Sequence, residues 1–371
     1  MKNLIWVGNK LSDIADCFQL FNKSINLYGK TNQDSICFQK FRCNNNIENP
    51  EVDSFIRETL LDEISKNNAK IMFYNPRKAY KFGGEIERNT ICLNDCFILE
   101  LLSDKITCHE FLRNEVNFAP FITLYGKYVN FNYLKKIFPS FNKFVIQSSK
   151  GSGGFETFVL TQENELPLEQ LINANIRYLI SGYIENNVSF NVHVIIGDSD
   201  YIIFPSSKQL IQLYNSQLIY RGADFINMDL LNNFNTSEIL SAAIIKLQKL
   251  GYRGIIGFDM ILDLKTSCIY LAEINSRFQG SSFILNKELK QKKLPTLQEL
   301  NMLAFGHVAL KDLIPFDLSI PYSSVMYYQD IDAPLSIDNS TLLTRDDDNL
   351  KDYGIRERYS YAYKKIYTKI I

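Results

Sequence analysis

Short apolar runs alternate with amphipathic stretches over the first hundred residues of the chain. Leu4–Gly8 has the pattern of a buried strand, and residues 13–21, after a polar turn, have a helical pattern. The amphipathic segment 53–66 predicts a second helix, and apolar runs at 70–74 and 90–93 predict two more strands. Strands that alternate with helices in this way are typical of an α/β lobe.

Beyond residue 102 the pattern shifts toward strands. A helix is expected at 107–115, with Ser103 as a candidate N-cap for its first turn. A long helix is expected at 236–250, ended by Gly251. The expected strands of this region lie at 144–147, 157–160, 178–184, 189–196, 201–205, 255–262 and 268–275. A mixed, β-rich second half therefore follows the α/β lobe.

Charge and composition exclude several classes of protein. The 371 residues include 40 Lys+Arg and 41 Asp+Glu, so the formal net charge is -1. A nucleic-acid partner is not expected, because nucleic-acid binders usually carry a basic excess or stripe. Hydrophobic residues make up 46% of the chain, which is typical of a folded protein, yet no apolar run is long enough for a membrane span.

The cysteines and histidines narrow the candidate chemistry further. Seven cysteines without a CxxC pair, and an N-terminus without a secretory signal, predict reduced thiols in a cytoplasmic protein. The three histidines are too scattered for a His-rich metal site. His193 is expected to be a core or half-buried side chain, and His109 is expected at the surface.

A glycine-rich segment follows the apolar run at 144–147. A glycine cluster lets backbone N–H groups approach phosphate oxygens, and Lys150 adds a positive charge. Residues 156–160 are rich in β-branched and aromatic residues, so the loop joins two strands and differs from a Walker loop, which leads into a helix. A plain glycine-rich hairpin remains the alternative.

Acidic side chains occur within two apolar strands that a short polar turn joins. The hairpin register places Asp259 about level with Glu273, and period-two alternation projects Glu273, Asn275 and Arg277 from the same side. Carboxylates inside apolar strands are costly unless something pairs with them, and nucleotide-bound magnesium is a natural partner. An internal ion pair between Arg277 and either carboxylate is the structural alternative.

Together and in this order, these segments resemble the ATP-grasp family. The resemblance rests on Leu102-Ser-Asp-Lys105, the strand-loop-strand of residues 147–159, Ser181-Gly-Tyr-Ile184-Glu-Asn-Asn, and residues 257–277, which end in Glu-Ile-Asn-Ser-Arg. It covers residues 1–310. The Glu-x-Asn-x-Arg sequence after an apolar hairpin is its most specific part.

The resemblance implies an α/β protein with an α+β grasp fold. A pre-ATP-grasp α/β lobe would occupy residues 1–102, and the central or lid subdomain of the grasp residues 103–184. The C-terminal subdomain with the metal site would occupy residues 185–310, and residues 311–371 would form an extension that packs on the grasp.

The resemblance also implies roles for individual residues. Asp259, Glu273 and Asn275 match the magnesium ligands. Arg277 matches the arginine that steadies the phosphoryl group. The expected catalytic residues are Arg277, Glu273 and Asn275. Lys105 matches a lysine near the α- and β-phosphates. The expected nucleotide-binding residues are Lys105, Gln147, Lys150, Gly151, Ser152, Gly153, Gly154, Tyr183, Ile184 and Ser189.

Two positions depart from the family pattern. Gln147 stands where most relatives have a lysine, and Ser181 where many have a glutamate. The Gln-x-x-x-Gly-Ser-Gly-Gly form, together with Asn191-Val-His193 and residues 206–209, is similar to a branch of peptide or amino-acid ligases. Lys150 is expected to supply the charge that Gln147 lacks.

Three residues are candidates for substrate contacts. Gln209 and Ser281 are expected near the substrate, and Arg221 is expected to meet a substrate carboxylate, with an ordinary turn arginine equally open. The resemblance implies an enzyme that uses ATP and Mg²⁺, with Mn²⁺ as an alternative metal. It would join a small carboxylate, such as an amino acid or peptide, to an amine through an acyl phosphate.

Two other functions stay open at this point. One is an acid–thiol ligase or small-molecule kinase on the same nucleotide site, and the other is an ATP-binding regulatory protein without turnover. A homodimer is the family expectation, and neither a nucleic acid nor a membrane is an expected partner.

Overall fold

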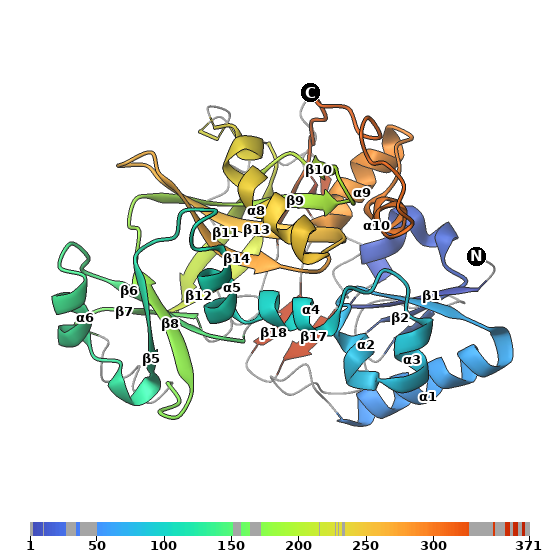
Figure 1. Ribbon diagram of the computed structural model, residues 1–371, viewed down its shortest axis with the longest axis horizontal. Helices are drawn as coiled ribbons and strands as arrows, with labels where there is room; N and C mark the ends of the chain where they lie inside the picture. Colours follow the sequence, from blue (N-terminus) through green and yellow to red (C-terminus); the bar gives the residue numbers. More distant parts are fainter. Residues whose placement is uncertain are drawn as a thin grey trace.

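The protein is described from a computed structural model. The described residues are 3–9, 11–26, 35–37, 50–150, 157–163, 172–214, 216–226, 228, 230–231, 234–325, 344–345, 353–356, 359–362 and 366–367. The ribbon has an N-terminal α/β lobe at one end and a β-rich lid at the other, and the lid strands continue into a large sheet that occupies the middle (Figure 1).

The N-terminal lobe is built on a four-stranded parallel sheet. Its order is β3 (Ser35–Cys37), β2 (Lys23–Asn26), β1 (Leu4–Gly8), β4 (Lys70–Phe73). The helix α1 (Pro50–Asn67) lies beside this sheet, while η1 (Leu11–Leu20) is a 3-10 helix where an α-helix was expected. The expected strand at 90–93 is reduced to a single bridge between Thr90 and Ile71. The prediction of an α/β lobe is confirmed.

Four short helices connect this lobe to the large sheet: α2 (Arg77–Phe82), α3 (Gly84–Asn89), α4 (Cys96–Ser103) and α5 (Lys105–Leu112). The expected cap is wrong by one residue, since Ser103 closes α4 and Asp104 caps α5. Asp104 Oδ1 accepts hydrogen bonds from the backbone N–H groups of Ile106 and Thr107. A carboxylate at this position also interacts favourably with the helix dipole.

The large sheet has eleven strands and mixes both halves of the predicted grasp. Its main path runs β14-β13-β9-β11-β12-β7-β6-β8-β5, with β10 on β9 and β15 on β12. The bounds are β5 (Phe121–Tyr125), β6 (Phe144–Ser148), β7 (Thr157–Leu160), β8 (Arg177–Gly182), β9 (Asn187–Ile196), β10 (Tyr201–Ile203), β11 (Ser207–Tyr214), β12 (Gln217–Asp224), β13 (Gly254–Asp263), β14 (Ile269–Asn275) and β15 (Ser323–Val325).

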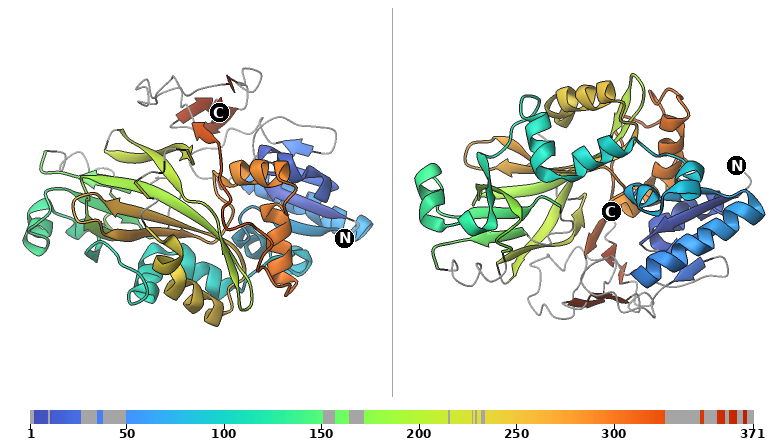
Figure 2. Two further views of the ribbon diagram at one scale, coloured as in Figure 1. Left: turned by 90° about the horizontal axis from the view of Figure 1, so that it is seen from above. Right: turned by 60° about the horizontal axis from the view of Figure 1, so that its bottom comes forward.

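The lid is one half of this sheet, formed by β5 to β8. Its side chains pack with α6 (Phe131–Ile137) in a core of their own around Phe144 and Ile146, and the short 3-10 helix η2 (Gly126–Tyr128) links β5 to α6. The other half meets the lid at β12 and β7, where the register pairs only Gln217 with Phe158 among the described residues. Figure 2 shows the lid standing apart from the N-terminal lobe.

The other half of the sheet carries three helices: α8 (Thr236–Leu250), α9 (Ser282–Gln291) and α10 (Leu297–Phe305). As expected, α8 ends at Gly251, which has φ 96° and takes the left-handed conformation that glycine adopts readily. Near the C-terminus, short strands pair β16 (Thr344–Arg345) with β19 (Ile366–Tyr367), and β17 (Tyr353–Arg356) with β18 (Tyr359–Ala362).

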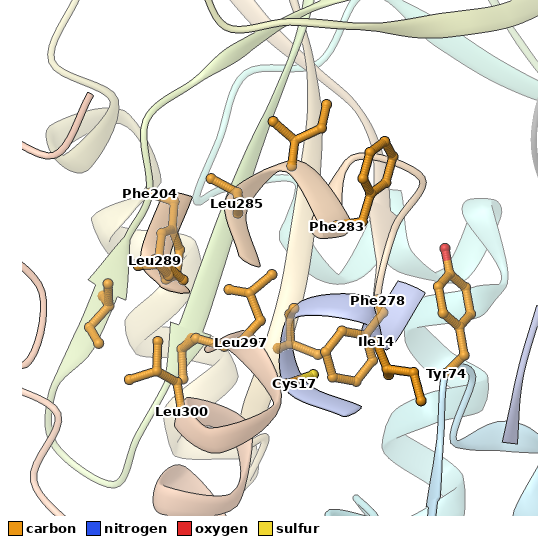
Figure 3. Packing of buried hydrophobic residues seen from close by; sticks show 14 of the residues in the cluster. Ile14, Cys17, Tyr74, Phe204, Phe278, Phe283, Leu285, Leu289, Leu297 and Leu300 are labelled. Carbon is orange, nitrogen blue, oxygen red and sulfur yellow. The ribbon is translucent and has the colours of Figure 1, made fainter. Parts of the chain in front are cut away.

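A shared hydrophobic core joins the N-terminal lobe to the C-terminal half. Figure 3 shows Ile14 and Cys17 of η1 beside Leu297 of α10, with Tyr74 and Phe278 close by. Burial raises the pKa of the Cys17 thiol, as expected for a packed, reduced cysteine. This core fixes the N-terminal lobe against the segment that follows β14.

Two sequence expectations concern the chain as a whole. In the ranges described above, no helix is long and apolar enough to cross a membrane. Because one sheet continues through the lid and the C-terminal half, the boundaries at 102, 184 and 310 remain predictions.

Candidate active site

A cavity of about 700 Å³ opens where the lid, the C-terminal half and the N-terminal lobe meet. This volume is in the range of small-molecule sites. Its wall includes Gln147 on β6, Asp259 on β13, Glu273 on β14, and Asn75 and Lys78 from the N-terminal lobe. Three parts of the fold that are distant in sequence therefore contribute to one cavity.

Two carboxylates lie side by side in the cavity wall. Asp259 and Glu273 are directly opposite each other in the antiparallel register of β13 and β14, with a bulge immediately after Asp259. Burial raises the pKa of Asp259 to about 7, and the negative charge of Glu273 adds to the shift. Charging both carboxylates at once is therefore unfavourable unless a cation lies beside them.

Amide side chains surround the Asp259 carboxylate. Oδ1 accepts hydrogen bonds from Asn191 Nδ2 at 2.5 Å and from Gln209 Nε2 at 2.9 Å, while Oδ2 accepts one from Asn275 Nδ2 at 2.9 Å. The amides come from β9, β11 and β14. Neutral donors hold this carboxylate in place without cancelling its charge.

A buried lysine pairs with the second carboxylate. Lys105 Nζ, at the start of α5, lies 3.4 Å from a Glu273 oxygen, and its side chain is 5% exposed. The backbone N–H of Lys105 also donates to Ser149 O at 2.8 Å, which ties α5 to the end of β6. Lys105 therefore contacts a residue of the cavity wall, although it does not itself line the cavity.

Arg277 lies on the cavity wall two residues beyond Asn275. Its Nη1 donates to the Phe278 carbonyl at 3.1 Å, and its guanidinium also donates a hydrogen bond to the Tyr74 hydroxyl oxygen. The pKa of Tyr74 is raised by burial, so the phenol stays protonated. The structural alternative, an internal ion pair between Arg277 and either carboxylate, is not among the ion pairs of the described residues, and Glu273 pairs with Lys105 instead.

The expected nucleotide-binding residues divide into three groups. Gln147, Tyr183, Ile184 and Ser189 all line the cavity. Gly151, Ser152, Gly153 and Gly154 lie outside the described residues. Lys150 does not line the cavity, because its Nζ forms an ion pair with Glu100 on α4 at 3.0 Å.

The expected substrate residues are also separated by the structure. Ser281 and Gln209 line the cavity, with Gln209 bonded to Asp259. Arg221 does not line it: the side chain is 1% exposed and donates to Gln212 Oε1 on the other face of the β11–β12 hairpin. The structure therefore does not bring Arg221 to the site where a substrate carboxylate was expected.

Both described internal histidines are buried and neutral. His193 is fully buried, as expected, and burial lowers its pKa to about 3. The expectation of a surface His109 is wrong. This ring packs on Phe118 and Phe121, with centroids at 4.2 and 5.2 Å, and burial lowers its pKa to about 4.

One wall residue that the sequence analysis missed is Gln279. It continues the alternation of Glu273, Asn275 and Arg277, and this period was the available signal. Gln279 Oε1 accepts a hydrogen bond from Asn191 Nδ2 at 2.7 Å. Gly257 makes room for this amide, since a Cβ there would lie 1.4 Å from Gln279 Nε2.

The donor set at this wall fits a magnesium ion accompanied by phosphate. The available ligands are oxygens of two carboxylates and an amide, and Mg²⁺ commonly takes one or two carboxylates plus phosphate oxygens. The raised pKa of Asp259 is the observation that tests the fit, because an added cation would stabilise the charged form. No group of three or more His, Cys, Asp or Glu side chains in the described ranges forms an all-protein metal cage.

Comparisons with known proteins show which family the region around this site is similar to. Residues 102–281 match the model of a family described as the ATP-grasp domain. A [butirosin acyl-carrier protein]–L-glutamate ligase from Niallia circulans is 26% identical over 194 residues, which make up 50% of this chain and 45% of that protein. The match therefore spans less than half the length of this curated relative.

Two solved structures share the fold. The biotin carboxylase domain of Hydrogenobacter thermophilus 2-oxoglutarate carboxylase, in complex with MgADP and bicarbonate, matches with a TM-score of 0.61 and 16% identity over 87% of this chain and 74% of that chain. N5-Carboxyaminoimidazole synthetase from Staphylococcus aureus, complexed with ADP, matches with a TM-score of 0.57 and 15% identity over 88% of this chain and 82% of that chain. The predicted fold class is confirmed.

Proposed function

Residues 102–281 match the ATP-grasp family, and from that premise we propose that the chain is an ATP- and Mg²⁺-dependent ligase that joins a carboxylic acid to an amine. The observation that carries the proposal is the half-buried pair of Asp259 and Glu273 in the wall of a cavity that Arg277 also lines. The acid or the amine would be an amino acid or small peptide.

The proposed reaction has two steps, phosphorylation of the acid and capture of the acyl phosphate by the amine. A carboxylate oxygen of the acid attacks the γ-phosphorus of ATP, the bond from that phosphorus to the bridging oxygen breaks, and ADP leaves. The amine nitrogen then attacks the acyl carbon, inorganic phosphate leaves, and the nitrogen loses a proton. Positioning and charge stabilisation account for most of the catalysis of such phosphoryl transfers.

The wall residues have separate tasks in this reaction. Asp259, Glu273 and Asn275 would hold Mg²⁺, which when bound neutralises phosphate charge. Arg277, fixed by the Tyr74 hydroxyl and the Phe278 carbonyl, would present its remaining donors to the transferring phosphoryl group. Burial of both histidines near the site supports a reaction in which neither serves as the base.

Nucleotide contacts would come from two sides of the cavity. Gln147 on β6, Lys105 on α5 and the loop of residues 151–154 would face the phosphates. Tyr183, Ile184 and Ser189 would hold the nucleoside, with the backbone N–H of Ile184 donating to adenine. Mn²⁺ is a second candidate metal, because the same oxygen ligands suit it.

We also propose a substrate class, a cellular location, an oligomeric state and a domain division. The Niallia circulans relative is named for joining L-glutamate to an acyl-carrier protein, which supports an amino acid as one substrate of this chain. Cys17, Cys92 and Cys108 are free thiols, as a protein of the reducing cytoplasm would have, and a cytoplasmic location is proposed on that ground. A homodimer and the four-part domain division are proposed from the family alone.

Release of ADP over a panel of acids and amines tests the proposed function. We expect rapid ADP release only when acid and amine are both present, and at least about a 100-fold loss in Glu273→Gln, which removes one wall carboxylate. ADP release with one substrate alone would favour a small-molecule kinase. ATP binding without ADP release for any pair would favour the regulatory protein.

A further inference from the structure

The hairpin of β11 and β12 contributes an apolar stripe to the cavity wall. Residues two apart on a strand share a face, and Ile211 and Leu213 on β11 line the cavity together with Leu218 and Tyr220 on β12. Ile211 is opposite Tyr220 in the register, and Leu213 is opposite Leu218. Two apolar cross-strand pairs therefore stand next to each other inside the cavity.

The stripe begins at the carboxylate wall. Gln209, two residues before Ile211 on the same face, donates to Asp259 Oδ1 at 2.9 Å. At the same end the Tyr220 ring lies close to Gly280, where an added Cβ would be 3.3 Å from Tyr220 Cε1. From Gln209 to Leu213 the strand spans about 14 Å at the usual rise per residue.

The β11 side of the stripe is exposed. Ile211 is 39% exposed and Leu213 is 53% exposed, although both belong to the cavity wall. Burying such apolar side chains is favourable, and ligand cavities are mostly lined by apolar groups that their ligands cover. The exposed stripe therefore offers apolar surface to a molecule held in the cavity.

The nucleotide is not the molecule that this stripe fits. The proposed phosphate and nucleoside contacts lie on α5, on β6 and in residues 151–154, after β8 and on β9, and none of them is on the β11–β12 hairpin. The stripe also carries no charged side chain to meet a phosphate. It is suited to an alkyl chain whose reacting end points toward Asp259 and Arg277.

We propose that the stripe of Ile211, Leu213, Leu218 and Tyr220 is a subsite for the alkyl chain of a substrate. The assignment of the reacting end rests on the proposed ligase function, whereas the apolar binding itself does not. The substrate class would be a carboxylic acid or an amine with an unbranched chain of several carbons. Gln209 marks the polar end of this subsite, at the carboxylate wall.

Binding of two homologous series in the presence of MgADP tests the subsite. Calorimetry with acetate, butyrate, hexanoate and octanoate forms one arm, and ethylamine, butylamine, hexylamine and octylamine form the other. We expect affinity to rise about fourfold for each added methylene in one series, as burial of that group predicts. The series that rises identifies the substrate bearing the chain, and affinity independent of length in both would overturn the proposal.

Two matched variants locate the effect on the protein. Leu213→Ser should lower affinity for the eight-carbon ligand of the rising series at least tenfold and leave affinity for its two-carbon ligand and for MgADP unchanged. Leu264→Ser is the control, since Leu264 is 46% exposed and lies outside the cavity wall. An equal loss in both variants would contradict the subsite.

Failure of the proposed reaction would look different. Chain-length-dependent binding without ADP release would support the subsite and contradict the ligase. Rapid ADP release with a two-carbon acid, and no gain in affinity with length in either series, would support the ligase and overturn the subsite.

Discussion

Asp259 lies directly opposite Glu273 across the β13–β14 hairpin, so two carboxylates share one wall of the cavity. Their closeness, together with burial, raises the pKa of Asp259 to about 7. Structural side chains rarely retain such a pair without compensation, because each carboxylate raises the cost of charging the other. The pair is the feature from which most of the following predictions derive.

The first prediction concerns metal affinity and pH. Mg²⁺ binds the charged carboxylate, so below pH 7 it must displace a proton from Asp259. We expect the Kd of Mg²⁺ in the presence of ADP to rise as pH falls from 8 to 5, approaching about tenfold per pH unit below the pKa. Calorimetry across this range measures it, and Asp259→Asn should lose this pH dependence.

The second prediction concerns stability without metal. The native state holds a proton on Asp259 with a pKa of about 7, while the unfolded state holds it near 3.8. The contribution of this group to stability is therefore fully present below about pH 4 and is lost as pH rises through 7. Wild type should gain stability relative to Asp259→Asn as pH falls from 8 to 5 in denaturant titrations, and parallel pH profiles would contradict the raised pKa.

The third prediction concerns the ion pair between Lys150 and Glu100. Glu100 binds Lys150 at 3.0 Å and also pairs with Arg77 at 2.9 Å, and these partners lower its pKa. If Lys150 serves the phosphates, Glu100 competes with ATP for it. Lys150→Ala should raise the KM for ATP about tenfold, or about 1.4 kcal/mol, and Glu100→Gln should lower it.

The control for this pair is Lys136→Ala, which removes another lid lysine, one that is exposed on α6 and lies outside the cavity wall. Its KM for ATP should match that of wild type. An unchanged KM in Lys150→Ala would show that Lys150 serves only the contact with Glu100.

The fourth prediction concerns His109. Burial against Phe118 and Phe121 lowers its pKa to about 4, while an unfolded histidine titrates near 6.5. The stability tied to the neutral ring is therefore lost as pH falls from 6.5 to 4, at up to about 1.4 kcal/mol per pH unit. His109→Leu should remove that part of the acid sensitivity, and the same slope in both proteins would place His109 in water.

The fifth prediction concerns the close approach of Gly257 and Gln279. A Cβ at position 257 would overlap the Gln279 amide, which must then leave its hydrogen bond with Asn191. Gly257→Ala should lower kcat about tenfold with a smaller change in thermal stability. Gly306→Ala is the control, since a Cβ there comes no closer than 3.2 Å to its neighbours, and it should retain wild-type kcat.

Local periodicity was sufficient to predict that the two carboxylates lie side by side. Alternation along β13 and β14, with one short turn, determined that Asp259 faces Glu273, and no distant contact was needed. The same alternation, continued beyond Arg277, also predicts that Gln279 lies on the cavity wall. The glycine-rich segment was likewise predicted to join two strands, and β6 and β7 lie on either side of it.

Long-range packing determines the parts that the sequence did not reveal. Tyr74 meets Arg277 because a core shared by η1, α9 and α10 fixes the N-terminal lobe, and no pattern around residue 74 indicates that partner. Lys150 meets Glu100 because α4 passes beside the end of β6. His109 looked exposed since its own helix is only weakly amphipathic, and the aromatic rings that cover it follow that helix.

Transfer of oxygen from the acid to phosphate tests the central claim most directly. With the acid–amine pair that gives the fastest ADP release, an acid labelled with ¹⁸O in both carboxylate oxygens is turned over in ordinary water. Attack of the carboxylate on the γ-phosphorus predicts one ¹⁸O atom in each inorganic phosphate released, measured by mass spectrometry. Phosphate without the label would contradict activation of the acid by phosphorylation.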